Sequence, residues 1–400
     1  MPQNVLLRKL RSARYRARAK MAEWREAARE AQKRRAVDAW IALLRDRPPQ
    51  VLIGANFADH GGVREHILSI GRYSSLRTEL VPSDRLLKLV VPHEIKTKFN
   101  AAFCQYRASG VLAVHSHVFP WFIEWCNALR SPRPLWVHTY HAPYFPNHRN
   151  GEHVAWQEEF NSALVNVARN ADVRISVSKW QQRYLSEAHG IETLYIPNGV
   201  DVAFCDTADP VRFTGTVQWG KFVLYVGRND PVKNPHEFLR LAAALPSLRF
   251  MMAGRDLSLE RLASETGIAA PGNLTVRGEM SHQQVIDAVA ACSAVVVTSL
   301  REGLPTVVLE AMTLRKPVVV PDEPGCVEAI DGGRLGHVYR PGDILDLREK
   351  TLAALSDPSR GDAGREFVLR EFDWRVIAPR LDAIYESGPA RSSSRARKPD

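Results

Sequence analysis

At residues 299–312 the chain has the sequence SLREGLPTVVLEAM, directly after the short β-branched run AVVVTS at residues 294–299. An apolar run of this length is typical of a strand buried on both faces of a parallel sheet. Gly303 ends the strand, and Pro305 suits the first turn of a helix because its missing N–H costs nothing there. The segment therefore predicts a strand, a loop and a helix of a parallel α/β sheet.

The loop of this segment has the features of an anion site. It lies at the carboxyl edge of the predicted sheet, where ligands bind, and the free N–H groups of the helix start favour an anion. Glu302 stands on the loop and Glu310 in the helix, so the two carboxylates can face separate hydroxyl-bearing parts of one ligand. The alternative is that both are ordinary structural charges, which are common. The segment suits a sugar nucleotide.

A second segment adds two cations. The run FVLYVGR at residues 222–228 predicts another buried strand that ends in glycine. Arg228 and Lys233 stand on either side of the Pro-containing turn that follows, so both can reach one pair of phosphates. The alternative is that both are ordinary surface cations on a loop, which is the commoner situation for Arg and Lys. The two segments together favour a diphosphate site.

With these and further motifs the chain resembles a retaining glycosyltransferase of family 4 (glycosyl transferases group 1), whose fold is the two-domain GT-B fold. The resemblance covers about residues 50 to 386, and several motifs in the right order are more specific than one. The further motifs are the Gly61–Gly62–Val63 loop, DVRISVS at 172–178, IPNGVD at 196–201, NLTVRG at 273–278 and GHVYRPGD at 336–343. One position departs from the family, which commonly has glycine where Arg315 stands. A left-handed backbone at an arginine costs about 1 kcal/mol relative to glycine.

The resemblance implies roles for matched residues. Arg228 and Lys233 would hold the donor diphosphate, and Glu310 the ribose hydroxyls. Glu302, with the amides of Gly303 and Leu304, would hold the donor sugar and phosphate. The predicted catalytic residues are His141, Glu302, Arg228 and Lys233, and the remaining donor-side positions are Gly61, Gly62, Arg277, Gly278, Met280, Pro305 and Thr306. The family also implies retention at the anomeric carbon, by front-face attack with the leaving phosphate as base.

Three residues are acceptor-side candidates: His117, Tyr140 and Tyr144. Core packing is an equally open interpretation for the aromatic residues, and a lone histidine such as His141 is more often packed than catalytic. The alternation of His115 and His117 suggests a metal pair, but no Cys or carboxylate stands at ligand spacing. No Asp-x-Asp motif occurs in the chain. We therefore expect no metal and no other cofactor.

Length and composition predict two α/β domains, since 400 residues with 45% hydrophobic content exceed one ordinary core. The predicted fold class is α/β, with two Rossmann-like domains facing a central cleft in a GT-B fold, plus a basic N-terminal helical extension. The predicted parts are the extension at 1–48, an acceptor domain at 49–200, a nucleotide-sugar-binding domain at 201–371, a crossing helix at 372–386 that returns to the first domain, and a disordered basic tail at 387–400.

Positive charge is concentrated at the two ends of the chain. Residues 1 to 47 contain 14 Lys and Arg against 5 Asp and Glu, and residues 391 to 400 contain 4 against 1, out of a total net charge of +10. The N-terminal segment has no Pro or Gly between Gln3 and Asp46, which predicts a long helix. Such a basic helix can lie on an anionic membrane, pair with a partner helix or stay solvated. Nucleic-acid binding is not expected, because no recognition motif is present.

Five scattered cysteines without a CxxC pair indicate a reducing compartment. With no signal peptide and no apolar run of about 18 residues, the expected location is the cytoplasm, with peripheral contact to the inner face of the membrane left open.

Three functions stay open. The first is transfer of a sugar from a nucleotide-diphosphate sugar to a glycan, glycolipid or polysaccharide-precursor acceptor. The second is a non-catalytic nucleotide-sugar-binding relative tethered to a partner or membrane, and the third is a glycoside phosphorylase.

Overall fold

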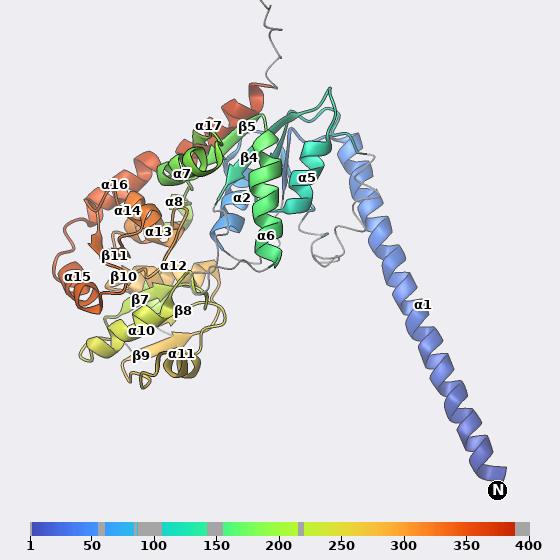
Figure 1. Cartoon of the computed structure of the whole chain (residues 1–400), viewed down its shortest axis with the longest axis horizontal. Helices are drawn as coiled ribbons and strands as arrows, with labels where there is room; N and C mark the ends of the chain where they lie inside the picture. Colours follow the sequence, from blue (N-terminus) through green and yellow to red (C-terminus); the bar gives the residue numbers. More distant parts are fainter. Residues whose placement is uncertain are drawn as a thin grey trace, which may run out of the picture.

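The computed structural model describes residues 2–54, 61–83, 86, 106–141, 155–214 and 220–388, with side chains from residue 18 onward except those of residues 155 and 156. These residues form two parallel sheets of six strands each, with helices on both faces (Figure 1). The two α/β units lie side by side, and a long helix projects from the first (Figure 1). This architecture confirms the predicted α/β class with two Rossmann-like units.

The first sheet has the strand order β2-β1-β3-β4-β5-β6. Consecutive residues of β1 alternate between two apolar clusters, with Leu52 in one and Val51 and Ile53 in the other, so both faces of the sheet are covered. The elements of this unit are β1 (Val51–Gly54), α2 (Gly62–Tyr73), β2 (Thr78–Val81), β3 (Ala113–Ser116), α5 (Pro120–Ala128), β4 (Leu135–Tyr140), α6 (Ala155–Ser162), η1 (Ala163–Val167), η2 (Ala168–Asn170), β5 (Val173–Ser176), α7 (Lys179–His189) and β6 (Leu194–Tyr195).

The second sheet has the strand order β12-β11-β10-β7-β8-β9. Its elements are α8 (Val202–Cys205), α9 (Pro210–Thr214), β7 (Val223–Val226), α10 (Pro235–Ala244), β8 (Phe250–Ala253), α11 (Leu259–Thr266), β9 (Leu274–Arg277), α12 (His282–Ala291), β10 (Ala294–Val296), α13 (Thr306–Thr313), β11 (Val318–Pro321), α14 (Pro324–Ala329), β12 (His337–Tyr339), α15 (Ile344–Ser356) and α16 (Gly361–Glu371).

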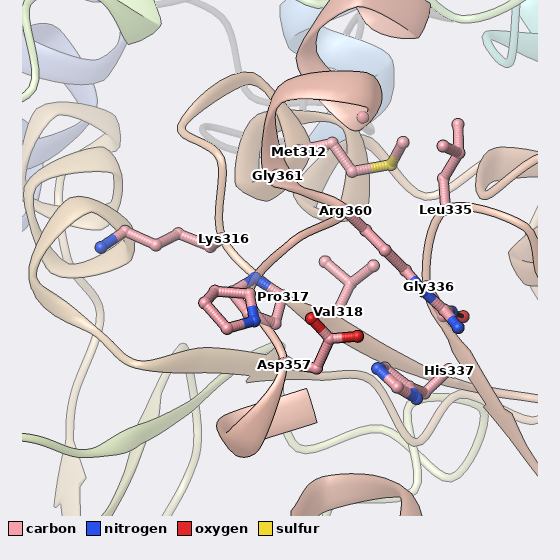
Figure 2. A pocket seen from close by; sticks show the side chains of 12 residues that line it. Met312, Lys316, Pro317, Val318, Leu335, Gly336, His337, Asp357, Arg360 and Gly361 are labelled. Atoms are coloured by element: carbon pink, nitrogen blue, oxygen red, sulfur yellow. Dashed lines mark hydrogen bonds between the residues drawn. The ribbon is translucent and has the colours of Figure 1, made fainter. Parts of the chain in front are cut away.

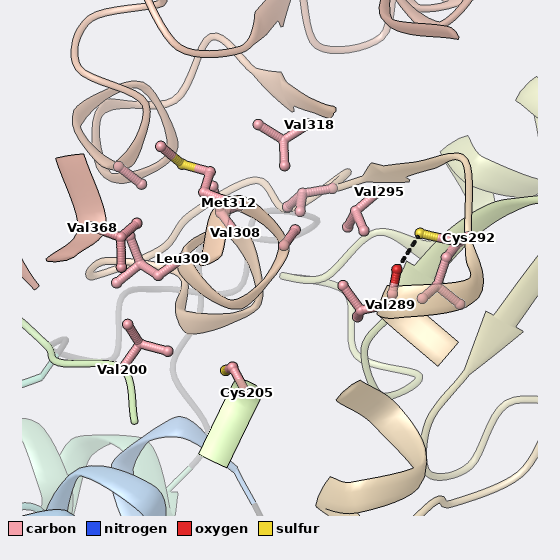
Figure 3. Close-up of a cluster of buried hydrophobic side chains, with 14 of the residues drawn as sticks. Val200, Cys205, Val289, Cys292, Val295, Val308, Leu309, Met312, Val318 and Val368 are labelled. Atoms are coloured by element: carbon pink, nitrogen blue, oxygen red, sulfur yellow. Dashed lines mark hydrogen bonds between the residues drawn. The ribbon is translucent and has the colours of Figure 1, made fainter. Parts of the chain in front are cut away.

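Helix α13 is the helix that the opening motif predicts, and it begins directly after Pro305. Its inner face packs through Val308 and Met312 into a cluster that also holds Val295 of β10 and Cys292 (Figure 3). This packing fixes the direction of α13, so the loop before it stands at the carboxyl end of β10. The predicted strand and helix are confirmed, although β10 itself ends at Val296 rather than Ser299.

The chain crosses between the two units at two adjacent points. Val200 and Asp373 form a parallel bridge, in which the Val200 N–H donates to the Phe372 carbonyl at 2.8 Å. Helix α17 (Trp374–Glu386) then lies beside α2 and buries Trp374 and Tyr385 in the core of the first sheet. A Cβ on Gly199 would lie 2.7 Å from the Trp374 ring, so glycine permits this close crossing. The two crossings between the units therefore lie next to each other.

The last turns of helix α1 (Pro2–Asp46) pack on the first unit. Val37, Trp40, Ile41 and Leu44 are buried in the core of the first unit, whereas Trp24 is 73% exposed. The rest of the helix extends away from the body (Figure 1). No helix in the described part of the chain combines the length and the apolar content that a membrane span requires.

Arg315 does adopt a left-handed backbone, with φ of 57°, at the position where the family commonly has glycine. Its guanidinium pairs with Asp362 at the start of α16, at 2.5 Å from Nε. The helix end therefore adopts a left-handed backbone in spite of the arginine.

A cavity lies beyond that helix end, between Pro317, Leu335, His337 and Arg360 (Figure 2). It opens at the amino ends of β11 and β12. Ligands of parallel α/β sheets bind at the opposite, carboxyl edge. This cavity is therefore separate from the site predicted from the sequence.

Candidate functional site

The loop from Gly303 to Thr306 is seated against the first unit. A Cβ on Gly303 would lie only 2.2 Å from the carbonyl oxygen of His141, so no larger residue fits this approach. The indole Nε1 of Trp180 donates to the Gly303 carbonyl at 2.8 Å, and Nδ2 of Asn198 donates to the Leu304 carbonyl at 3.1 Å. The motif loop of the second unit therefore closes directly on the carboxyl edge of the first sheet.

Two helix starts face each other across this contact. Gly61 precedes α2 with φ of 121°, a conformation that favours glycine. A Cβ on Gly62 would lie 3.4 Å from the hydroxyl oxygen of Thr306, the first residue of α13. Each helix start presents free N–H groups and the positive end of a helix dipole. The predicted donor-side residues Gly61, Gly62, Pro305 and Thr306 are thus brought together around one anion-favouring position.

The two predicted phosphate cations are each held by a carboxylate. Lys233 Nζ lies 2.5 Å from Glu302 Oε1, and Arg228 Nη2 lies 2.6 Å from Asp230 Oδ2. Partly exposed ion pairs of this kind contribute little, about 0 to 1 kcal/mol, so a diphosphate can compete for the cations. The pairing links the loop after β7 to the loop after β10, and it brings Glu302 and Lys233 of the predicted site into contact.

Glu310 is 8% exposed and accepts a hydrogen bond from His282 Nε2 at 2.7 Å. The other ring nitrogen of His282 lies 3.8 Å from Glu65 of α2, so the imidazole stands between the two units. Burial lowers the pKa of His282, but the hydrogen bond that it donates to Glu310 and the charges of Glu310, Glu65 and Asp201 outweigh it and raise the pKa above 6.5. His282 thus connects Glu310 of the second unit with Glu65 of the first.

His141 is buried at the end of β4, and its Nε2 lies 3.1 Å from Nδ1 of His117. Burial lowers the pKa of both rings well below 6.5, so both are neutral at pH 7. Neutral imidazoles donate and accept hydrogen bonds without adding charge. His141 stands beside the Gly303 loop, and His117 adjoins it.

The remaining predicted residues lie at or after the ends of β9 and β4. Arg277 ends β9, and Gly278, Glu279 and Met280 lead from it to the start of α12, beside His282. Tyr140 belongs to the apolar core of the first unit and is 1% exposed, so its position corrects the acceptor-side prediction and assigns it to packing. Strand alternation explains the difference, because Tyr140 and His141 point to opposite faces. Tyr144 lies outside the described residues.

Sequence reasoning did not single out His66, His282 or Asn198. His66 lies one helical turn after Gly62, so a helix starting at the glycine pair would have placed it near the same end. Asn198 stands in the motif IPNGVD but received no role, and His282 had no signal; their contacts with Leu304 and Glu310 join distant parts of the chain.

Comparison with known protein families gives two matches in chain order. A family described as Glycosyltransferase Family 4 matches residues 84–204, and one described as Glycosyl transferases group 1 matches residues 213–366. The first match covers most of the first sheet, and the second covers the sheet that carries Arg228, Lys233, Glu302 and Glu310.

Individual relatives agree with these matches. The chain is 25% identical over 357 residues to a phosphatidyl-myo-inositol mannosyltransferase of Mycobacterium leprae, covering 82% of this chain and 93% of that protein. Among solved structures it resembles sucrose-phosphate synthase from Thermosynechococcus elongatus, with a TM-score of 0.68, 19% identity and coverage of 84% and 98%. It also resembles Anabaena HepE in complex with UDP-glucose, with a TM-score of 0.67, 18% identity and coverage of 85% and 100%. These structures show the two-domain GT-B fold.

Proposed function

Because the chain belongs to the family 4, group 1 glycosyltransferases, a group of nucleotide-sugar hexosyltransferases, we propose that it transfers a sugar with retention and without a metal. The donor is a nucleotide-diphosphate sugar, and the acceptor is a glycan, a glycolipid or a polysaccharide precursor. The observation that carries this proposal is the closure of the Gly303 loop on His141. It gathers two helix starts, two cations and two carboxylates around one position.

The donor diphosphate would lie at the facing starts of α2 and α13. Lys233 and Arg228 would exchange their carboxylate partners for phosphate oxygens, and Glu310 would accept hydrogen bonds from the ribose. HepE binds UDP and UDP-glucose with this fold, which makes uridine nucleotides the first donors to try.

The transfer itself breaks the bond between the anomeric carbon and the phosphate oxygen. Negative charge grows on the leaving phosphate, where fixed cations and helix N–H groups stabilise it without reorganising. The phosphate oxygen then takes the proton of the incoming acceptor hydroxyl on the same face of the sugar, so configuration is retained. Neutral His141 would accept or donate a hydrogen bond at the sugar ring. Closure of the two units excludes water, the competing acceptor.

The acceptor proposal rests on the projecting helix α1 and on the M. leprae relative, whose name specifies a phosphatidyl-myo-inositol acceptor. A helix with this positive excess is attracted to anionic lipid by about 1 kcal/mol for each nearby Lys or Arg. We propose that α1 brings the site to a lipid-linked or membrane-proximal acceptor at the cytoplasmic face of the membrane. Sedimentation with phosphatidylserine vesicles tests this, and loss of α1 residues 2–28 should abolish the binding.

The donor proposal is tested by thermal stabilisation with uridine and guanosine diphosphates and their sugar conjugates. A ligand at 100 times its Kd stabilises the folded state by about 2.7 kcal/mol. We expect one nucleotide series to stabilise the native chain and to have no effect on Arg228→Ala or Glu310→Ala. Arg334→Ala is the matched control, because Arg334 also pairs with a nearby aspartate but lies away from the site. A chain that no sugar nucleotide stabilises would contradict the donor site.

A further inference from the structure

Three histidines from three separate elements meet beside the proposed sugar position. They are His66 of α2, His117 after β3 and His141 after β4, and one ring nitrogen of each lies within 4.8 Å of the others. All three are buried, with side chains 3%, 0% and 6% exposed. The ring centroids of His66 and His141 are 4.7 Å apart, and those of His117 and His141 are 5.3 Å apart.

Several ring nitrogens of these three histidines make no normal hydrogen bond within the described part of the chain. Nε2 of His117 and Nδ1 of His141 have no hydrogen-bond partner among the described residues, and neither nitrogen of His66 makes a hydrogen bond of normal geometry, although the Asn198 side chain lies beside that ring. Buried polar atoms without partners are rare and call for an explanation, and for the nitrogens of His66 an ion would supply one. Both ring nitrogens of His115, by contrast, have hydrogen-bond partners, since they lie 2.6 Å from the Tyr385 hydroxyl and 2.8 Å from the Thr139 hydroxyl. The His115–His117 pair considered from the sequence is therefore not a ligand pair.

We propose that His66, His117 and His141 bind a zinc-class divalent metal ion, and that the bound ion inhibits sugar transfer. Three imidazole nitrogens are a set that Zn²⁺ favours, with a fourth position left for water or substrate. Zn–N bonds of about 2.0 to 2.1 Å in a tetrahedron place ligand nitrogens about 3.3 Å apart. His117 Nδ1 and His141 Nε2 are already 3.1 Å apart, so binding requires these two rings to give up their shared hydrogen bond and turn toward the ion, and His66 to move closer.

The surroundings of the cluster predict reversible binding. Ligand histidines usually donate their second N–H to a carboxylate or carbonyl, and loss of such a partner costs about 10- to 100-fold in metal affinity. His117 Nε2 and His141 Nδ1 have no such partner among the described residues. The site should therefore bind metal more weakly than a structural zinc site, and a chelator should remove the ion without unfolding the chain.

The inhibitory part of the inference rests on the proposed function. His141 is the residue whose carbonyl meets Gly303, and under the proposed function its ring makes hydrogen bonds with the sugar. A metal that holds this ring would remove its hydrogen bonds from the sugar and would occupy space beside the ring. Metal binding itself is independent of this step, because all three ligands belong to the first unit.

Metal binding is measured on the full chain without donor, by competition with a chromophoric chelator and by the visible absorption of Co²⁺. We expect one Zn²⁺ per chain, a Co²⁺ spectrum typical of nitrogen ligation, and a loss of affinity of at least about tenfold in His66→Gln and in His117→Gln. His236→Gln is the control, because His236 pairs with Glu265 on the surface of the other unit. Absence of stoichiometric binding, absence of the Co²⁺ spectrum, or unchanged affinity in both variants would overturn the site.

Inhibition is measured separately. Transfer by the native chain should fall as Zn²⁺ fills the site and should return fully when EDTA is added. Undiminished transfer at full occupancy would overturn the inhibitory role. A chain that binds Zn²⁺ but transfers no sugar under any condition would contradict the proposed function and leave the metal site standing.

Discussion

Lys233 has two tasks that can be separated by experiment. In the free site it neutralises Glu302 at 2.5 Å, and with donor bound it would contact phosphate. Its side chain is 28% exposed, so the ion pair adds little to folding. We predict that Lys233→Met lowers kcat/KM by about 100- to 1,000-fold, which is typical of losing one charge-stabilising group. Steady-state kinetics with the donor found by thermal stabilisation measure this.

Lys350→Met is the matched control for this change. Lys350 is 32% exposed and also pairs with carboxylates, Glu349 and Asp346, but on the surface of α15. Its replacement should leave kcat/KM within about twofold, and both variants should unfold at nearly the native temperature. Equal kinetic losses in the two variants would show that Lys233 has no special place in the site.

His138 makes the stability of the first unit depend on pH. Its Nδ1 accepts from the Ser116 hydroxyl at 2.8 Å, which itself accepts from Trp136 Nε1, and burial lowers its pKa to about 3. Between pH 6.5 and about 3 the unfolded chain therefore binds a proton that the folded chain does not. Stability should fall as pH falls through this window, by about 1.4 kcal/mol per pH unit for this group.

The test compares urea unfolding of the native chain and His138→Asn at several pH values between 6.5 and 4.5. The variant should be less stable at pH 7, because it loses packing. As the pH falls, however, its free energy of unfolding should decrease less steeply than that of the native chain, and the difference in slope should correspond to about one bound proton. Parallel curves for the two proteins would mean that His138 is not the neutral buried base described here.

At the scale of elements, the loop before α13 joins the two units through contacts that require glycine. We predict that Gly303→Ala folds normally but lowers kcat/KM by more than about tenfold, because its Cβ would lie 2.2 Å from the His141 carbonyl and keep the units apart. Gly272→Ala is the control, since nothing lies within 4 Å of a Cβ there. Native activity in Gly303→Ala would contradict the closed arrangement as the active one.

Helix α1 should divide into a dispensable part and an essential part. Removal of residues 2–28 deletes only the projecting turns, and we expect the unfolding temperature to change by no more than a few degrees. Removal of residues 2–47 also deletes Val37, Trp40, Ile41 and Leu44, whose burial stabilises by about 1.5 to 3 kcal/mol each. Thermal unfolding of the two truncated chains measures this, and equal stability would show that the packing of α1 contributes nothing.

The sequence predicted single strands and helices better than it predicted contacts between distant elements. Local patterns were sufficient for β10, α13 and β7, because periodicity, Gly303 and Pro305 act within one strand or helix. The same patterns could not predict that Asn198 reaches Leu304, which depends on how the two units meet, or that His66 joins His117, which depends on how separate segments of the first unit pack. Tyr140 was misplaced for a related reason, since a strand residue at the sheet edge can face either the cleft or the core.

At the scale of the whole molecule, closure is the property on which the proposed activity depends. The units are joined at the adjacent crossings of Val200 and Asp373, and they also touch through Trp180, Asn198 and His282. Donor and acceptor are thus expected to enter an opened cleft. We expect the donor-side and acceptor-side groups to come close to one another when this cleft closes.

The central claim is retention without a metal, and NMR of the transferred sugar tests it most directly. The purified chain is incubated in EDTA with the donor identified by thermal stabilisation and a glycan or lipid acceptor, and the anomeric configuration is recorded as product first appears. The account predicts product with the donor's anomeric configuration, formed at a rate that EDTA does not reduce. An inverted product, or transfer that EDTA abolishes and added metal restores, would contradict it.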